Sequence, residues 1–365
     1  MRVAEPPAPA LAALVESVGP VRAAAMVRAG EVSAPVLDET SARRGEDHAD
    51  EDLANAARAG ARLIAPEDSD WPAWQLLALD QGAARDLRWA RAPLGLWVRG
   101  GEQLSELVDR AVSVVGARAA TGYGEHVAAE FGHGLASQGW TIVSGAAYGI
   151  DGAAHRGALA AGGRTVAVLG CGIDTGYPAG HSGLIDRIAE TGLVISEYAP
   201  GTPPARHRFL VRNRLIASLS AGTVVVEAGV RSGARNTAGS AAALGRELMA
   251  VPGPITSAMS IGCHELLRSG LAIPVTSVAE VLESAGRLGE TFAPSPAGPR
   301  RPTDGLVDEA LRVHEALTTR AGTSSERIAI DSGVPLPRVR AILPELELTG
   351  LAQRCEAGWR RACGR

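Results

Sequence analysis

The chain has 365 residues, 46% of them hydrophobic, which is enough for a sizeable core and for two or three domains. Its 36 basic and 40 acidic residues give a formal net charge of −4, which excludes a protein that attracts nucleic acid through its bulk charge. All 36 basic residues are arginine, so the choice of arginine over lysine at any one position carries little information.

Cysteine usage and the amino-terminal sequence indicate the compartment. The four cysteines show no C-x-x-C spacing, as expected in a reducing cytosol. Residues 1–10 do not resemble a signal peptide, and no run of 18 apolar residues is present to span a bilayer. We therefore expect a cytoplasmic protein with no membrane partner.

Residues 1–85 are predicted to form a small helical domain. Apolar residues at helical spacing run from Leu11 to Val18 and end at Gly19-Pro20, and a second helix follows over Ala23–Val27. This pattern is typical of a SAM-like or helix-hairpin-helix-like domain that binds DNA backbone, and equally of a plain αα-hairpin. Seven acids and two arginines within residues 38–52 argue against a large phosphate-binding face there.

Residues 86–289 are predicted to form a doubly wound α/β domain. Seven short apolar runs each end in a glycine- or serine-rich turn, and stretches of helical length such as 125–138 and 233–244 separate them. This rhythm predicts a parallel sheet with its ligand crevice at the carboxyl ends of the strands. Pro274 places the last strand at an edge, because proline cannot donate to a central ladder. The predicted strands are 111–115, 140–143, 165–169, 193–195, 223–226, 248–251 and 272–275.

The remaining residues are predicted to form a linker and a third domain. Four prolines and little apolar content within residues 290–304 indicate the linker. Residues 305–365 have the pattern of three helices and a hairpin, which predicts a winged helix, with its third helix interrupted by Pro344. Only Arg338 and Arg340 lie on that third helix, against two glutamates, which favours a protein-contact or structural role over reading of the major groove.

One segment of the α/β domain is rich in arginine. Residues 205–214 are interpreted as a long turn that holds four arginines and Phe209. This composition suits a phosphate chain with stackable bases better than a small neutral metabolite. Residues 198–246 carry seven arginines and a single acid, Glu227, for a local net charge of +6, although a solvated face remains the alternative.

A dinucleotide or ATP site is disfavoured by the spacing of the glycines. Gly116, Gly122 and Gly124 follow the first predicted strand of the α/β domain, which is not the G-x-G-x-x-G spacing. A second glycine set, residues 170–176, comes closer, but Tyr177-Pro178 follows where a helix should begin. The chain also lacks the lysine of a Walker A motif.

A catalytic site has weak candidates. Asp151 and His155 share a helix face at i, i+4, but an acid favoured by the helix dipole beside an unrelated histidine gives the same pattern. Cys171 lies in a glycine loop, where a buried unreactive thiol is the commoner case. Glu227 at a strand end is the best single acid, and with the glycine loops it supports an alternative function, an α/β nucleotide-processing enzyme.

Single-stranded nucleic acid is the third candidate ligand. Glycine and serine turns at strand ends expose backbone N–H groups that can hold phosphates. Arg118, Arg212 and Arg214 would add positive charge, and Phe209 or Tyr148 a stacking face. A lone aromatic residue such as Phe209 is equally typical of a core anchor.

Several motifs, in order along the chain, resemble the DNA-processing protein A (DprA, or Smf) family over residues 94–284. Each motif alone is weak evidence for the family, whereas the whole set in this order is specific for it. The motifs are Val115-Gly116-Ala117-Arg118, Ser144-Gly145 with Gly149-Ile150-Asp151, Ser196-Glu197-Tyr198, Phe209 with Arg212-Asn213-Arg214, Glu227-Ala228, Ser232-Gly233, Thr237-Ala238, Val251-Pro252-Gly253 and Gly262-Cys263.

The resemblance implies an extended Rossmann-like domain that binds and protects single-stranded DNA. It implies a homodimer without enzymatic activity or a cofactor, which helps to load the recombinase RecA during natural transformation. By this likeness the DNA-binding residues are Gly116, Arg118, Ser144, Gly145, Arg208, Phe209, Arg212, Asn213, Arg214 and Thr237.

Overall fold

The computed structural model describes residues 2–286, 293 and 302–362, which fall into two compact units, Met1–Ala293 and Pro294–Arg365. Most of the predicted linker, residues 290–292 and 294–301, lies outside the described residues. Among the helices that the structure describes, none is long and apolar enough to cross a membrane.

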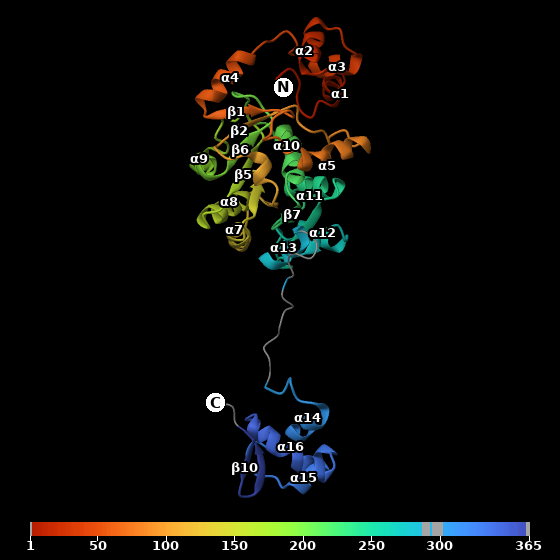
Figure 1. Ribbon diagram of the computed structural model, residues 1–365, viewed down its shortest axis with the longest axis vertical. Helices are drawn as coiled ribbons and strands as arrows, with labels where there is room; N and C mark the ends of the chain where they lie inside the picture. The colour runs from red at the N-terminus through yellow and green to blue at the C-terminus, as the bar shows by residue number, and fades with distance from the viewer. Residues whose placement is uncertain (1, 287–292, 294–301, 363–365) are drawn as a thin grey trace. The chain divides into compact units, whose positions relative to one another are not determined.

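The first unit is built on a nine-stranded sheet of order β1-β2-β6-β5-β4-β3-β7-β8-β9 (Figure 1). All seven predicted strands are present and parallel to one another, with β9 at an edge as Pro274 indicates. The strands are β1 (Ala61–Ile64), β2 (Leu96–Arg99), β3 (Ala111–Val115), β4 (Thr141–Ser144), β5 (Thr165–Leu169), β6 (Leu193–Ser196), β7 (Gly222–Val225), β8 (Glu247–Ala250) and β9 (Ile273–Pro274).

Two strands were not predicted. β2 pairs antiparallel with β6, and β1 pairs antiparallel with β2 at the opposite edge from β9. β1 belongs to residues 1–85, so the sheet takes a strand from the segment that was expected to be a separate helical domain. That segment also contains the expected short helices: α1 (Pro9–Val18), α2 (Pro20–Ala29), α3 (Ala34–Thr40), α4 (Ala49–Arg58) and α5 (Ala73–Ala84).

Helices cover both faces of the sheet, because successive side chains of a strand point to opposite faces. In β3, Ala111 and Val115 pack with one helix layer, and Val112 and Val114 pack with the other. The first layer contains α5, α10 (Arg206–Ser218), α11 (Ala234–Ala243) and α12 (Ile261–Arg268). The second contains α7 (Gly122–Ser137), α8 (Ile150–Ala160), α9 (Ser182–Thr191) and α13 (Val278–Ala285), and the short α6 (Leu104–Leu107) precedes β3.

The arginine-rich segment is a helix, so its interpretation as a long turn is wrong. It forms α10, and residues 206–218 contain neither glycine nor proline to end it. All side chains from Arg212 to Ser218 are buried, so polar residues point inward and the segment lacks the apolar stripe by which a surface helix is identified.

The second unit consists of three helices and a hairpin: α14 (Asp308–Glu315), α15 (Ser325–Ser332), α16 (Leu336–Leu348), β10 (Ala352–Cys355) and β11 (Gly358–Arg361). The expected interruption at Pro344 is wrong, because α16 continues through this residue. The apolar side chains of Leu343 and Leu346 pack in the small core of the unit. This packing stabilises the helix and offsets the loss of the backbone hydrogen bond that proline cannot donate.

The strand order locates a crevice at one edge of the sheet. From β3 the chain proceeds outward through β4, β5 and β6, then returns to place β7 on the other side of β3. The connections that leave β3 and β7 therefore diverge to opposite faces of the sheet. In doubly wound folds, ligands bind at such a switch point, beyond the carboxyl ends of the strands.

Candidate nucleic-acid interface

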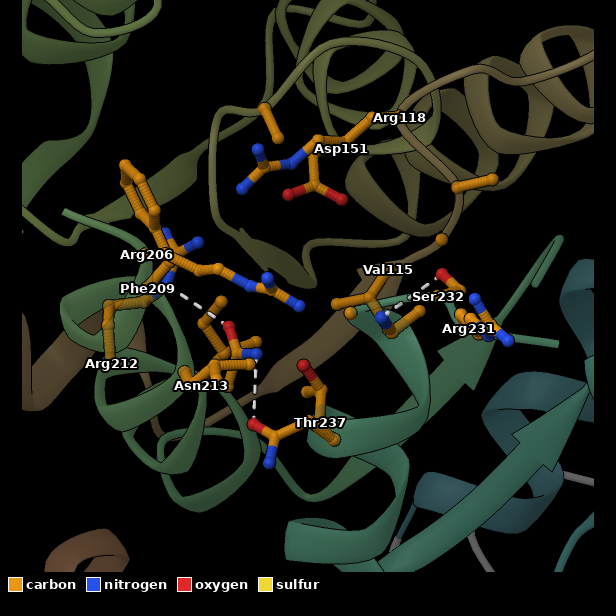
Figure 2. A pocket seen from close by; sticks show the side chains of 18 of the residues that line it. Val115, Arg118, Asp151, Arg206, Phe209, Arg212, Asn213, Arg231, Ser232 and Thr237 are labelled. Carbon is orange, nitrogen blue, oxygen red and sulfur yellow. Dashed lines mark hydrogen bonds between the residues drawn. The ribbon is translucent and has the colours of Figure 1, made fainter. Parts of the chain in front are cut away.

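A cleft of about 860 Å³ opens at this switch point. Its walls are the turn after β3 (residues 115–119), the first half of α10 and the loop 229–234 that leads into α11. Figure 2 shows Arg206, Phe209 and Asn213 of α10 on one side, Arg231 and Ser232 on the other, and Arg118 and Asp151 above them. The sequence-predicted crevice and this cleft coincide.

Glycines let the turns pack closely at the strand ends. A Cβ on Gly116 would lie 2.4 Å from Ile150 Cγ1, and one on Gly145 would lie 2.6 Å from the Arg212 guanidinium, so neither position has room for a side chain. The neighbouring N–H groups are already used: that of Ala117 donates to the Glu227 carbonyl (2.8 Å), and that of Gly145 to the Asp151 carboxylate (3.2 Å). These glycines therefore shape the cleft more than they offer donors to it.

Ser144 does not reach the cleft. Its side chain is fully buried, and its hydroxyl donates to the Val114 carbonyl on the adjacent strand at 2.6 Å. The hydroxyl of Ser144 thus joins β3 and β4, and the backbone contact to DNA that the family resemblance implies for this residue stays a prediction.

Arg212 forms the floor of the cleft. Its guanidinium donates to the carbonyls of Gly145 (3.0 Å) and Val168, and its Nε donates to Asn213 Oδ1 (3.3 Å). Burial lowers the pKa of Arg212 to about 10, an effect that the nearby Asp151 carboxylate opposes, so the side chain stays charged at neutral pH. It places a fixed positive charge beneath any ligand.

Asp151 also lines the cleft, from the first turn of α8. Burial raises the pKa of its carboxyl, against the opposing effects of Arg212 and of backbone N–H groups from Ala147 and Gly145. The carboxylate holds Arg212 and the Gly145 turn in place. It is therefore a positioning group that faces a cationic surface.

Phe209 combines both roles that the sequence left open. The ring stacks on Tyr177 with centroids 5.3 Å apart, and it covers Gly170, where a Cβ would lie 2.6 Å from Phe209 Cδ1. The ring is nevertheless only half-buried, and it lines the cleft. The guanidinium carbons of Arg118 and Arg212 lie 5.2 and 5.9 Å from its centroid, which is cation–π range.

Five of the seven arginines in residues 198–246 are engaged within the protein, and Arg212, with its carbonyl contacts, is one of them. Arg214 is 2% exposed and makes a bidentate pair with Glu197, with both N···O distances 2.8 Å. Arg208 pairs with Glu5 at 2.7 Å, and Arg235 pairs with Glu265 at 2.7 Å. Arg246 donates to the carbonyls of Gln75 and Ser218. Arg208 and Arg214, both implied as DNA contacts, line no part of the main cleft.

Three exposed arginines of the cleft have no such partner. Within the described residues, Arg118, Arg206 and Arg231 line the cleft and make no hydrogen bond or ion pair. They come from the turn after β3, the first turn of α10 and the loop before α11. Three separate elements therefore direct unneutralised guanidinium groups to one hollow.

Two arginines and an asparagine of the cleft were missed from the sequence. Arg206 lies on the same face of α10 as Phe209 and Asn213, at spacings of three and four residues, so a helical reading of this segment would have found it. Arg231 lies in a loop whose position depends on the fold. Asn236 accepts a hydrogen bond from Asn213 (3.1 Å), which fixes the side chain of this predicted contact, and the predicted Thr237 lines the cleft beside it.

The catalytic candidates are used elsewhere in the structure. Glu227 is 1% exposed, and its carboxylate accepts from the N–H (2.9 Å) and hydroxyl (2.6 Å) of Thr121 at the start of α7. Burial raises the pKa of the Cys171 thiol to about 11, which keeps it protonated and unreactive. His155 is fully buried against Thr165. The described residues contain no group of three or more potential metal ligands.

Comparison with known proteins agrees with the geometry. The profile of DNA recombination-mediator protein A matches residues 62–286. The putative DNA processing protein DprA of Mycobacterium tuberculosis is 50% identical over 359 residues, covering 98% of this chain and 92% of the relative. Protein Smf of Escherichia coli is 38% identical over 306 residues, covering 82% of this chain and 78% of the relative.

A solved structure agrees as well. The X-ray structure of DNA processing protein A from Streptococcus pneumoniae superposes with a TM-score of 0.62 at 33% identity, covering 75% of this chain and 90% of that chain. The chain therefore belongs to the DNA recombination-mediator protein A family, which includes the proteins named DprA and Smf.

Proposed function

We propose that the cleft binds single-stranded DNA and that the protein acts in DNA processing during transformation and recombination. The observation that carries this proposal is the convergence of the unpaired Arg118, Arg206 and Arg231 on one cleft that also exposes the ring of Phe209. Guanidinium groups suit phosphates, and an aromatic face suits an unpaired base.

The arrangement favours a single strand over a duplex. In a duplex the faces of the bases are stacked on one another, so Phe209 would have no base to contact. In a single strand each base has a free face, and stacking on an aromatic side chain contributes about 1–3 kcal/mol. The overall charge of −4 supports the same view, because duplex binding through non-specific attraction needs a broad basic surface.

A double variant tests the cleft directly. We expect Arg118→Ala/Arg206→Ala to weaken binding of a labelled oligothymidylate and to reduce the slope of log K against log salt by about 1.4, since each phosphate contact on a single strand contributes about 0.7. Arg187→Ala, which removes an exposed arginine from α9, is the matched control. Affinity and slope equal to those of the unaltered protein would place the DNA site elsewhere.

The family membership supports three further proposals. The protein forms a homodimer, it delivers the bound strand to the RecA recombinase, and the three helices and hairpin of residues 305–365 form a winged-helix domain that contacts a partner. Sedimentation of the full chain tests the first. RecA filament assembly on protein-coated single strands, with the full chain and with a variant lacking residues 303–365, tests the other two.

The enzyme alternative loses its best residue in this structure. The carboxylate of Glu227 is turned into the protein and holds Thr121, so it faces no ligand in the cleft. The relatives are named for DNA processing and for recombination mediation, and none of these names describes an enzymatic activity.

A further inference from the structure

A second groove continues from the cleft. It has a volume of about 500 Å³ and lies between α10 and α11. Leu210 and Asn236 line both hollows, so a chain that leaves the cleft past these two residues enters the groove directly.

The walls of the groove differ in chemistry. On α11 the groove is lined by the small residues Gly239, Ser240 and Ala243, which leave room for a backbone to approach. On the opposite side lies the half-buried indole of Trp89. An aromatic side chain opposite small residues provides a stacking face with space above it.

Two arginines, Arg235 and Arg85, lie at or next to the groove. Arg235 lines the end next to the cleft, and its side chain remains 38% exposed although it pairs with Glu265. Arg85 does not line the groove, but its guanidinium donates at 3.2 Å to the carbonyl of Ala243, which does, and no carboxylate contacts Arg85 among the described residues. No acid is found among the described side chains that line the groove.

We propose that the groove between α10 and α11 is a second segment of the DNA path, in which the strand leaving the cleft stacks a base on Trp89 and places phosphates near Arg235 and Arg85. This inference rests on the proposed function of the cleft. The lack of acids among the described lining side chains and the two arginines at or next to the groove favour a polyanion over a second protein surface, and the shared lining residues make it the same polyanion.

Gly239 allows the groove to be filled without disturbing the fold. A Cβ on this residue would meet no atom within 4 Å, and its backbone has ordinary helical geometry within α11. Gly239→Gln should therefore fold at least as well, because glutamine favours a helix interior more than glycine does. Gly183→Gln is the matched control, since Gly183 is likewise exposed and unobstructed, on α9.

The test compares oligothymidylates of about 4 to about 30 nucleotides, which span the site sizes of single-strand binding proteins. Some oligomers will be just long enough for their binding to be measured. We expect Gly239→Gln to bind these with the affinity of the unaltered protein, and to bind the long oligomers with about tenfold lower affinity. Trp89→Ala should show the same length dependence, Trp89→Phe should restore much of the loss, and Gly183→Gln should behave as the unaltered protein.

Each other outcome contradicts a different claim. If Gly239→Gln binds long oligomers as well as the unaltered protein does, the groove is not part of the path, while the cleft is unaffected. If the unaltered protein binds neither short nor long oligomers, the proposed function itself fails. If Gly239→Gln shows the expected loss on long oligomers but also sediments differently from the unaltered protein, a second copy of the chain covers the groove, and the inference is overturned.

Discussion

At the scale of single residues, the same side chain type performs two separate tasks in this protein. Arg214 is buried in a bidentate pair with Glu197, whereas Arg118 is exposed in the cleft with no carboxylate beside it. Sequence alone places both in the family's motifs and cannot separate them, because burial and ion pairing are properties of the folded chain. The separation matters, because a guanidinium that is buried in an ion pair, like that of Arg214, is not available to a phosphate.

Alanine substitutions should distinguish the two arginines. Arg214→Ala leaves the Glu197 carboxylate buried without its partner, and we expect a loss of about 3–5 kcal/mol in the free energy of unfolding. Arg118→Ala should change that free energy by less than about 0.5 kcal/mol, because it alters an exposed side chain. Urea denaturation followed by circular dichroism measures both. Equal destabilisation by the two substitutions would contradict the assignment.

At the scale of elements, α10 directs its amino terminus to the cleft. The first intrahelical bond is donated by the N–H of Phe209 to the Ala205 carbonyl, so the N–H groups of Arg206, His207 and Arg208 precede it and are free of the helix ladder. These groups and the helix dipole favour an anion there. Ala205 at the N-cap has extended backbone geometry but no side chain able to cap.

Substitution of the N-cap separates stability from binding. Ala205→Asn and Ala205→Asp should each raise the free energy of unfolding by about 0.5–2 kcal/mol, since both side chains cap a helix. Only the aspartate places a negative charge where a phosphate would lie, so it should weaken single-strand binding while the asparagine does not. If both variants bind the oligonucleotide equally well, the amino terminus of α10 lies away from the DNA.

The elements show where prediction from sequence succeeds. β3 and β5 are predicted to the residue, because short β-branched runs bounded by glycine are typical of buried parallel strands. β1 and β2 are missed, because each is defined by pairing with a strand distant in the chain: β2 pairs antiparallel with β6, about 100 positions away, and β1 pairs antiparallel with β2. The cleft follows from strand order, but Arg206 is identified as one of its residues only once α10 is known to be a helix, and Arg231 only once the loop before α11 is placed by the fold.

At the scale of the whole first unit, the amino-terminal segment is tied to the α/β sandwich through Glu5. Its carboxylate pairs with Arg208 of α10 at 2.7 Å and with Arg43 at 2.6 Å. Nearby, Arg2 pairs with Asp52 and donates to the Pro200 carbonyl at 2.7 Å. The contacts of Glu5 with Arg208 and of Arg2 with Pro200 join residues that the sequence assigned to separate domains.

Acid should loosen this connection. Burial alone would raise the pKa of Glu5, but hydrogen bonds from Arg208 and Arg43 prevail and lower it from 4.5 to about 2. A lowered pKa means that the pairs stabilise the fold fully above pH 4.5 and that this contribution is lost as the pH falls toward 2. We expect Glu5→Gln to be about 1 kcal/mol less stable than the unaltered protein at neutral pH, with the difference vanishing in acid. A difference that is independent of pH would show that Glu5 contributes no charge-dependent stability.

The most direct test of the account is a titration of the full chain with one labelled oligonucleotide, first single-stranded and then annealed to its complement. Fluorescence anisotropy at low and moderate salt gives the affinity for each. The cleft described above predicts that the single strand binds more tightly than the duplex and that its affinity falls steeply with salt. Equal affinity for both forms, or no binding to the single strand, would contradict the assignment of the cleft to single-stranded DNA.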